Sequence, residues 1–221
     1  MKKIIWVFGE SATGKLTLIN KLYNGDVDTI NTFNMNNEKI SISEITLEDR
    51  NHDKYNYIVD NNNYDDSLME EEGLYFNKEK ELLRRKGIMS DTEEFLNNDS
   101  DILLIKGQVN DMNIKRGNII GNFLGKYASR NDIEIEVYIL QVTDNDILKK
   151  RIESKPWFKE FESQEEKDRL LTEIPMKQEK HKNDVISCFS SYSIPISIIE
   201  SLNNSYRIEG VINGKSSNIR R

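Results

Sequence analysis

A glycine-rich string near the beginning of the chain constrains the fold more than any other feature. It reads G-x-x-x-x-G-K from Gly9 to Lys15 and follows an uninterrupted apolar run at residues 3–8. Such a run is typical of a central parallel strand that is covered on both faces. After the string, leucine and isoleucine recur at helical spacing as far as residue 22. The order of strand, glycine turn and helix predicts an α/β fold with a mostly parallel sheet.

The same string predicts a binding site for phosphate. Glycines let the backbone curl so that successive N–H groups point at phosphate oxygens, and the following helix adds its positive end. Lys15 would bridge the β- and γ-phosphates of a nucleoside triphosphate, which we expect to be ATP. An ordinary glycine turn is the alternative, but it does not account for spacing, order and flanking elements together. The predicted nucleotide-binding residues, called the glycine loop below, are Gly9, Glu10, Ser11, Ala12, Thr13, Gly14, Lys15, Leu16 and Thr17.

The end of the glycine loop departs from the most common pattern. The residue after the lysine usually offers a hydroxyl group to magnesium, but here it is Leu16, and Thr17 comes one step later. This G-K-x-T ending resembles the loop of adenylate kinase and related nucleoside monophosphate kinases. The resemblance implies that Thr17 contacts phosphate and that Mg²⁺ is held largely through water.

A carboxylate at the end of a second strand is the expected partner of Mg²⁺. Residues 55–60 read as a strand that ends in Asp60, and α/β proteins usually place their chemistry at the carboxyl ends of strands. Asp60 is therefore the candidate for orienting the metal or for accepting the proton of an attacking hydroxyl. Capping of a helix or turn is the competing interpretation. The predicted metal-binding residues are thus Thr17 and Asp60, and the predicted catalytic residues include Lys15 and Asp60.

Three polar residues lie at or just beyond the end of another buried strand, which we expect within residues 101–108. Lys106, Gln108 and Asp111 lie where open parallel sheets bind ligands. We expect these three residues to bind the acceptor substrate. A solvated loop is the alternative.

The segment after the strong strand at residues 133–142 looks like the lid of a kinase. A helix capped by an aspartate carries Arg151, and a charged stretch extends the expected lid over residues 151–182. Arg151 is the third predicted catalytic residue, because a cation on a closing lid stabilises the charge of the transferred phosphoryl group. A solvated helix face is the competing interpretation. The aromatic residues of the lid, Phe158 among them, either stack on a base or pack the core of the lid.

The rest of the chain supplies further elements. Strands are expected at residues 39–46 and 194–199, and helices at residues 77–86, 92–96 and 112–127. Residues 26–37 read mostly as a loop, and the basic tail at residues 213–221 is expected to be frayed. Gly117, Gly121 and Gly125 are spaced by four and predict the close approach of another backbone.

Composition sets limits on the class of protein. A chain of 221 residues suits one domain, residues 1–221. A net charge of −7 argues against a general electrostatic clamp on nucleic acid and leaves room for a local basic groove. Cys188 is the only cysteine, which excludes an internal disulfide and a zinc site made of cysteines. His52 and His181 have no partners at metal-ligand spacing, so neither receives a role.

The amino-terminal apolar run ends too early for a signal peptide or a membrane span. A single cysteine suits a reducing compartment. We therefore expect a cytoplasmic protein, in the host cytoplasm if the chain is viral, without a membrane partner.

The glycine loop, the order of strand and helix, and the lid-like segment together resemble the P-loop kinases of nucleotides and nucleic acids. The resemblance implies a three-layer α/β fold like that of the nucleoside monophosphate kinases, with ATP and Mg²⁺ as cofactors. It also implies transfer of the γ-phosphoryl group to a hydroxyl of a nucleotide or DNA acceptor. Within this group, the chain looks most like bacteriophage kinases that phosphorylate 5-hydroxymethyluracil in DNA during base hypermodification. A deoxynucleoside monophosphate kinase and a non-catalytic nucleotide-dependent switch or assembly protein stay open as alternatives.

Overall fold

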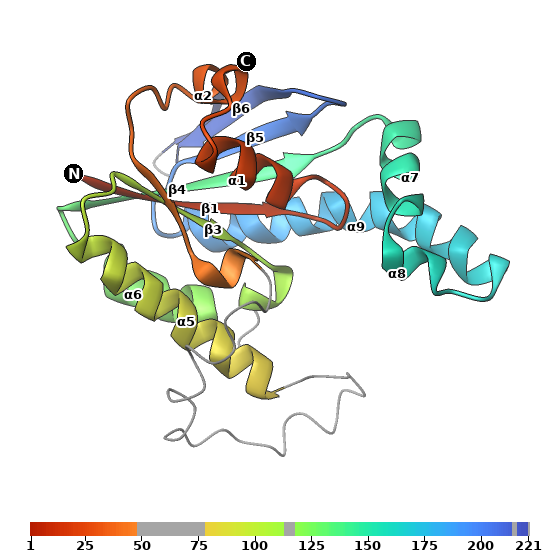
Figure 1. The fold of residues 1–221 in the computed structure, drawn as a ribbon, viewed down its shortest axis with the longest axis horizontal. Helices are drawn as coiled ribbons and strands as arrows, with labels where there is room; N and C mark the ends of the chain where they lie inside the picture. Colours follow the sequence, from red (N-terminus) through yellow and green to blue (C-terminus); the bar gives the residue numbers. More distant parts are fainter. Residues whose placement is uncertain (48–77, 113–117, 214–215, 221) are drawn as a thin grey trace.

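The computed structural model describes residues 1–47, 78–112, 118–213 and 216–220 (Figure 1). The strands in this part of the chain are β1 (Lys2–Gly9), β2 (Ile40–Ile42), β3 (Ile102–Lys106), β4 (Ile133–Gln141), β5 (Ile196–Ser201), β6 (Tyr206–Asn213) and β7 (Ser216–Arg220). The helices are α1 (Lys15–Tyr23), α2 (Val27–Thr32), α5 (Lys78–Asn97), α6 (Ile119–Tyr127), α7 (Asn145–Glu153), α8 (Pro156–Lys159) and α9 (Gln164–Ser190), with short 3₁₀ helices η1 (Glu44–Leu47) and η3 (Val109–Met112).

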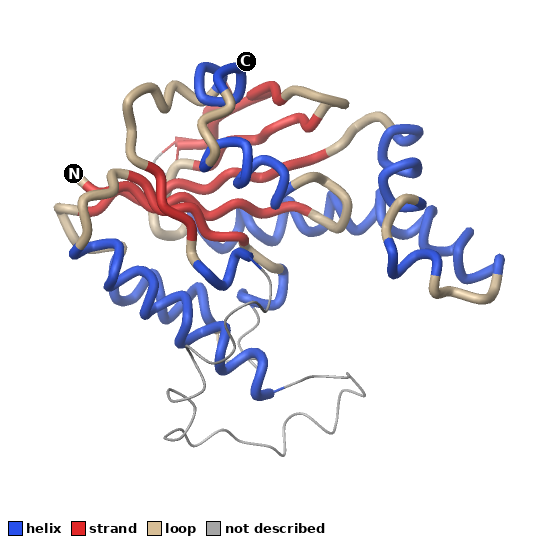
Figure 2. The backbone as a smooth tube through the Cα atoms, in the orientation of Figure 1, coloured by secondary structure: helices blue, strands red, loops and turns tan. Residues whose placement is uncertain are grey.

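The described strands form one sheet in the order β2-β3-β1-β4-β5-β6-β7. The pairs from β2 to β5 are parallel, and β6 and β7 are added antiparallel. Helices lie on both faces of this sheet (Figure 2). The α/β class and the mostly parallel sheet that the sequence predicted are confirmed.

Strand β1 is the centre of the molecule. It pairs with β3 on one side and with β4 on the other, and its residues 4–8 are completely buried. Alternate side chains point to opposite faces, so that Ile4, Trp6 and Phe8 enter one hydrophobic cluster while Ile5 and Val7 enter another. An uninterrupted apolar run is therefore needed here, because neither face of the strand meets water.

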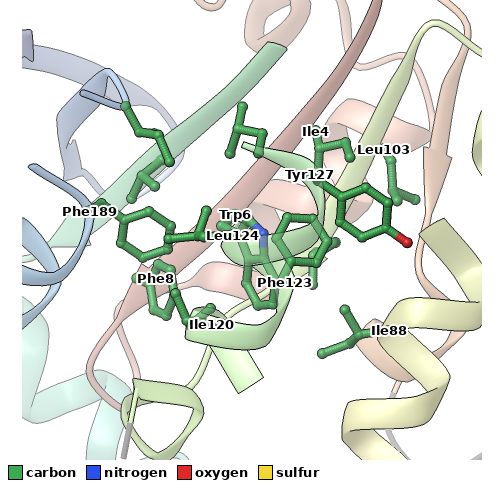
Figure 3. Packing of buried hydrophobic residues seen from close by; sticks show 14 of the residues in the cluster. Ile4, Trp6, Phe8, Ile88, Leu103, Ile120, Phe123, Leu124, Tyr127 and Phe189 are labelled. Atoms are coloured by element: carbon green, nitrogen blue, oxygen red, sulfur yellow. The ribbon is translucent and has the colours of Figure 1, made fainter. Parts of the chain in front are cut away.

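The first cluster lies between the sheet and the helices α5, α6 and α9. Its centre is aromatic: Trp6 stacks on Phe8 with ring centroids 5.9 Å apart and meets the edge of Phe123 at 5.1 Å (Figure 3). Phe189 of α9 packs against Phe8 at 5.5 Å. These contacts fix α9 against this face of β1. They therefore determine which residues of α9 reach the end of that strand.

The opposite face of the sheet is covered by α1 and by the segment around α2. Leu18, Ile19 and Leu22 of α1 are buried, as the helical spacing predicted. Phe33 stacks on Tyr138 of β4 with centroids 5.3 Å apart. This face therefore holds α1, and with it the glycine loop, tightly against the sheet.

A third, smaller cluster joins α7, α8 and α9 beyond the end of β4. It consists of Val142, Leu148, Ile152, Phe158 and Ile174. Phe158 is buried in it, which confirms the core-packing interpretation of this aromatic residue. The segment predicted as a lid thus has an apolar core of its own.

Several local expectations need correction. Residues 26–37 contain α2, because the Asp26 side chain accepts a hydrogen bond from the Thr29 amide and begins a helix. The helices expected at 77–86 and 92–96 are one continuous helix, α5. Strand β6 was not predicted, and residues 216–220 of the tail expected to be frayed pair with it as β7. The strand expected at residues 55–60 lies outside the described residues.

The expected close approach of a backbone to the spaced glycines is not found where it can be tested. A Cβ at Gly125 would have open space, and the atoms nearest to one at Gly121 would belong to the side chain of Asn118 in the same segment. Gly117 lies outside the described residues. Within the described part of the chain, no helix is long and apolar enough to cross a membrane.

Gly107, just after β3, is the position where a glycine is sterically required by the core. A Cβ there would overlap the ring of Phe8, which is held by Trp6 and Phe189. We predict that Gly107→Ala lowers the free energy of unfolding by about 1–3 kcal/mol through overpacking. Gly125→Ala is the matched control and should stabilise the protein by up to about 1 kcal/mol, since it replaces an exposed glycine inside α6. Urea unfolding measures both, and equal effects would contradict the prediction.

Candidate functional site

The glycine loop lies at the carboxyl end of the central strand. From β1, the parallel sheet continues in one direction through β3 and in the other through β4. In open α/β sheets, ligands bind at this kind of position, because the helices leave the sheet to opposite faces there. The loop leads from β1 directly into α1, whose first residues are the last residues of the glycine loop.

The backbone of the loop can form only with glycine at its first position. Gly9 has a φ of 147°, and a Cβ on it would lie 2.5 Å from the Thr13 hydroxyl oxygen and 2.7 Å from the carbonyl oxygen of Leu140. The Thr13 hydroxyl donates a hydrogen bond to the Glu10 carbonyl at 2.8 Å, and this bond closes the turn. Gly14 also has a positive φ, 92°, at the position preceding α1. The loop is thus folded back on the end of the sheet.

The amino terminus of α1 is open toward solvent. Its N-cap residue is Gly14, which has no side chain to accept from the first amide groups, and no acidic residue occurs in the first turn. Lys15 is the first helical residue, and its Nζ donates to the carbonyl oxygens of Gly9 at 2.6 Å and of Glu10 at 3.1 Å. The ammonium group is therefore held directly over the loop, beside uncapped helix amides, an arrangement that favours an anion.

A larger cleft of about 820 Å³ opens beside the loop. It is lined by Gly9, Glu10, Ser11, Ala12, Gly14, Lys15, Leu16, Thr17, Lys106, Gly107, Gln108, Lys155, Pro156, Glu160 and His181. The structure therefore brings the predicted residues Lys15, Thr17, Lys106 and Gln108 to one cleft. Three lysines and the two glutamates Glu10 and Glu160 contribute to its wall, so that a chain of net charge −7 has a small local excess of positive charge here.

A smaller cleft of about 250 Å³ lies on the other side of α1 and shares part of the loop with the larger one. It is lined by Ala12, Gly14, Thr17, Lys21, Arg151, Ser154, Lys155, Ser201, Leu202, Asn203, Asn204 and Tyr206. Arg151 reaches it from α7. Its guanidinium donates to the Ser201 hydroxyl at 2.9 Å and to the Leu202 carbonyl at 2.6 Å. Arg151 thus lies at the edge of the loop and is not a solvated helix residue.

Asp111 has a different position from that of its predicted neighbours. It is completely buried, and its carboxylate accepts from Arg84 Nε at 2.7 Å, from Arg84 Nη2 at 2.9 Å and from the Gln108 amide at 2.7 Å. These bonds tie α5 to the turn after β3. Asp111 therefore lies behind the larger cleft, where it supports the turn that carries Gln108.

His181 also lines the larger cleft, and the sequence did not indicate it. It comes from α9, where Gln178, one turn earlier, donates to and accepts from the backbone of Val142 at 3.1 and 2.9 Å. This pairing holds α9 at the end of β4 and brings His181 to the glycine loop. Its Nδ1 lies 3.8 Å from Oε2 of Glu10, and burial lowers the pKa of the ring. No spacing rule predicts such a contact, because the two residues come from opposite ends of the chain.

The predicted metal site is only partly visible. Thr17 is exposed at the meeting point of the two clefts, whereas Asp60 lies outside the described residues. Within the described ranges, no group of three or more histidine, cysteine, aspartate or glutamate side chains is arranged to hold a metal ion. The assignment of Mg²⁺ to Thr17 and Asp60 stays a prediction.

No family model matches the chain, and no curated protein matches it significantly. Functional inference therefore depends on the glycine loop and on the two clefts that meet at it.

We predict that Asp111→Ala destabilises the fold strongly. The substitution leaves the buried Arg84 guanidinium without this carboxylate, and breaking a buried ion pair in this way costs about 3–5 kcal/mol. The double variant Arg84→Met/Asp111→Leu should recover most of the loss, because it removes both buried charges. Urea unfolding compares the variants. Unchanged stability of Asp111→Ala, together with weakened binding of an acceptor, would instead support the original prediction of direct contact.

The buried ring of His181 predicts a pH dependence of stability. The pKa of the folded ring lies below its ordinary value of 6.5. Well above pH 6.5 the ring is neutral in both the folded and the unfolded state, so it has no effect on stability. Below this pH the unfolded chain takes up the proton first, so the free energy of unfolding falls, by at most about 1.4 kcal/mol per pH unit. Unfolding at pH 7.5, 6.0 and 5.0 measures this slope. It should be smaller in His181→Leu, and equal slopes would contradict the prediction.

Proposed function

We propose that this chain is a P-loop kinase that binds ATP through the glycine loop and transfers the γ-phosphoryl group to a hydroxyl of a nucleotide or nucleic-acid acceptor. One observation carries the proposal. The G-x-x-x-x-G-K string joins the central parallel strand to a helix, with Lys15 over an uncapped helix terminus at the point where two clefts meet. A phosphate-transfer enzyme needs this combination, because it must hold a donor and an acceptor on either side of one phosphoryl group.

The two clefts suggest how donor and acceptor are divided. The smaller cleft has the side chains of Asn203, Asn204 and Tyr206, which suit the hydrogen-bonding edge and the face of a nucleobase. The larger cleft has Lys106 and Gln108 opposite the loop, and these residues suit an acceptor that carries phosphate. In this proposal the triphosphate lies along the loop with its γ-phosphate toward the larger cleft.

Cationic side chains would stabilise the charge of the transferred group. Lys15 is already at the loop, and Arg151 borders it from α7. Lys155 lines both clefts, so a small movement of residues 151–182 would bring positive charge over the phosphates. This segment is the proposed lid. Mg²⁺ would neutralise phosphate charge, and Thr17 and Asp60 are its proposed ligands.

The acceptor is proposed from the resemblance noted in the sequence and from the three lysines that line the larger cleft. We propose 5-hydroxymethyluracil in bacteriophage DNA, whose exocyclic hydroxyl would be phosphorylated during base hypermodification. The cluster of Lys15, Lys106 and Lys155 suits the phosphates that flank such a base.

Transfer of radiolabelled γ-phosphate tests the proposal. The protein is incubated with labelled ATP and Mg²⁺ and is offered, in parallel, free deoxynucleoside monophosphates, unmodified DNA and DNA that contains 5-hydroxymethyluracil. We expect label on the modified DNA. Lys15→Ala should lose transfer by about 10²–10³-fold while keeping its circular dichroism spectrum and thermal midpoint, because it removes one cation from the transferred phosphoryl group.

The outcomes separate the alternatives. Label on a free nucleotide would identify a monophosphate kinase, whereas ATP binding without labelling of any acceptor would favour a nucleotide-dependent switch. Transfer by Lys15→Ala at the rate of the unchanged protein would contradict the assignment of the loop.

A further inference from the structure

We propose that His181 is the general base that takes the proton from the attacking hydroxyl, with Glu10 orienting its ring. This inference rests on the proposed kinase function and adds to it a catalytic residue within the described part of the chain. Three observations support it: His181 lines the larger cleft, its ring nitrogens have no hydrogen-bond partner, and the carboxylate of Glu10 lies beside the ring.

The ring of His181 is buried, and its nitrogens have no hydrogen-bond partners. Only 4% of the residue is exposed, and neither Nδ1 nor Nε2 has a hydrogen-bond partner. Buried polar groups almost always have partners, and a group without one destabilises the fold. The ring nevertheless lines the larger cleft together with Lys106 and Gln108. A buried side chain at a cleft without a hydrogen-bond partner is suited to form a hydrogen bond with a group of the bound substrate.

The neighbours of the ring determine the role of each nitrogen. Nδ1 lies 3.8 Å from Oε2 of Glu10, longer than a hydrogen bond, and a shift of about 1 Å on substrate binding would make one. Glu10 is itself held by the loop, because its Oε1 accepts from the Ser11 amide at 2.9 Å. With Nδ1 directed to Glu10, Nε2 remains for the acceptor. This nitrogen is also buried and without a partner in the free protein, so the same shift of the ring would have to open it to the cleft.

Burial, more than the charges that face the ring, keeps it neutral in the free protein. Burial is the largest influence and lowers its pKa, Lys15 of α1 lowers it further, and Glu10 of the loop and Asp184 of α9 raise it. Lys106 lines the same cleft from the end of β3. A neutral imidazole at pH 7 is the form that can accept a proton.

The acceptor O–H gives its proton to Nε2 of His181 while its oxygen forms a bond to the γ-phosphorus. The bond between the γ-phosphorus and the bridging oxygen breaks, and its electron pair leaves with ADP. The imidazolium formed is stabilised by the carboxylate of Glu10 and returns its proton to solvent after the products leave.

The test compares His181→Gln with Lys180→Gln, a matched change at the exposed neighbouring position of α9. Binding of ATP to the unchanged protein is measured first, and then transfer from labelled ATP to the acceptor that this protein labels, between pH 5 and 8. For the protein without substitutions, we expect the rate of transfer to rise with pH and then level off. His181→Gln should bind ATP normally, but its rate of transfer should fall by about 10²–10⁴-fold. It should also lose the rise of the rate with pH at the acidic end of the profile, called the low-pH limb below. Lys180→Gln should behave like the unchanged protein.

Two further variants separate catalysis from folding. Glu10→Gln should move the low-pH limb of the transfer rate to lower pH, because the Glu10 carboxylate raises the pKa of the His181 ring. His181→Leu should have a thermal midpoint at least as high as that of the unchanged protein while transfer is lost, since it removes buried nitrogens that lack partners. A lower midpoint with transfer retained would indicate a structural histidine.

Transfer by His181→Gln at the unchanged rate and with the same pH limb would overturn the role of His181 and leave the kinase intact. Failure of the unchanged protein to bind ATP, or to transfer phosphate at all, would overturn the proposed function, and the proposal for His181 with it. The order of the measurements distinguishes the two results.

Discussion

The close approach between the glycine loop and strand β4 is the constraint on which the site depends. The register of β1 and β4 continues to the pair Gly9 and Leu140, so the loop turns away from the sheet only after its first residue is already paired. A side chain at residue 9 would collide with the neighbouring carbonyl. Because β1 is buried on both faces and paired on both edges, the loop has a fixed base. The direction of α1, the position of Lys15 and the walls of both clefts follow from it.

The sequence predicted the elements whose signals are local. The apolar run of β1, the helical spacing of α1 and the aspartate that caps α7 each identify an element without knowledge of its neighbours. The antiparallel extension by β6 was missed because its residues alternate too weakly to stand out beside polar turns. The position of α2 was missed because one cap, Asp26, determines it within a polar segment.

In the candidate site too, the residues with a local sequence signal were predicted, and those that depend on packing were not. Residues in the segments that follow β1 and β3, such as Lys15 and Gln108, were predicted because the ends of parallel strands meet at one edge of a sheet. Asp111 was placed correctly beside them in sequence, but its contact with Arg84 depends on how α5 packs, and this cannot be read from spacing. His181 depends on the path of a helix of 27 residues and had no local signal at all.

The ammonium group of Lys15 has a consequence for ligand discrimination. In the structure, two loop carbonyls already act as its acceptors, so the protein contains an internal competitor for every anion that enters the site. A ligand gains from this lysine only the difference between its own attraction and that of the carbonyls. A singly charged anion would gain little, whereas the proposed triphosphate would also reach the amides of α1 and would carry enough charge to displace both carbonyls. In the proposed function, the resting contact of one side chain would thus act as a threshold that favours polyphosphates over small anions.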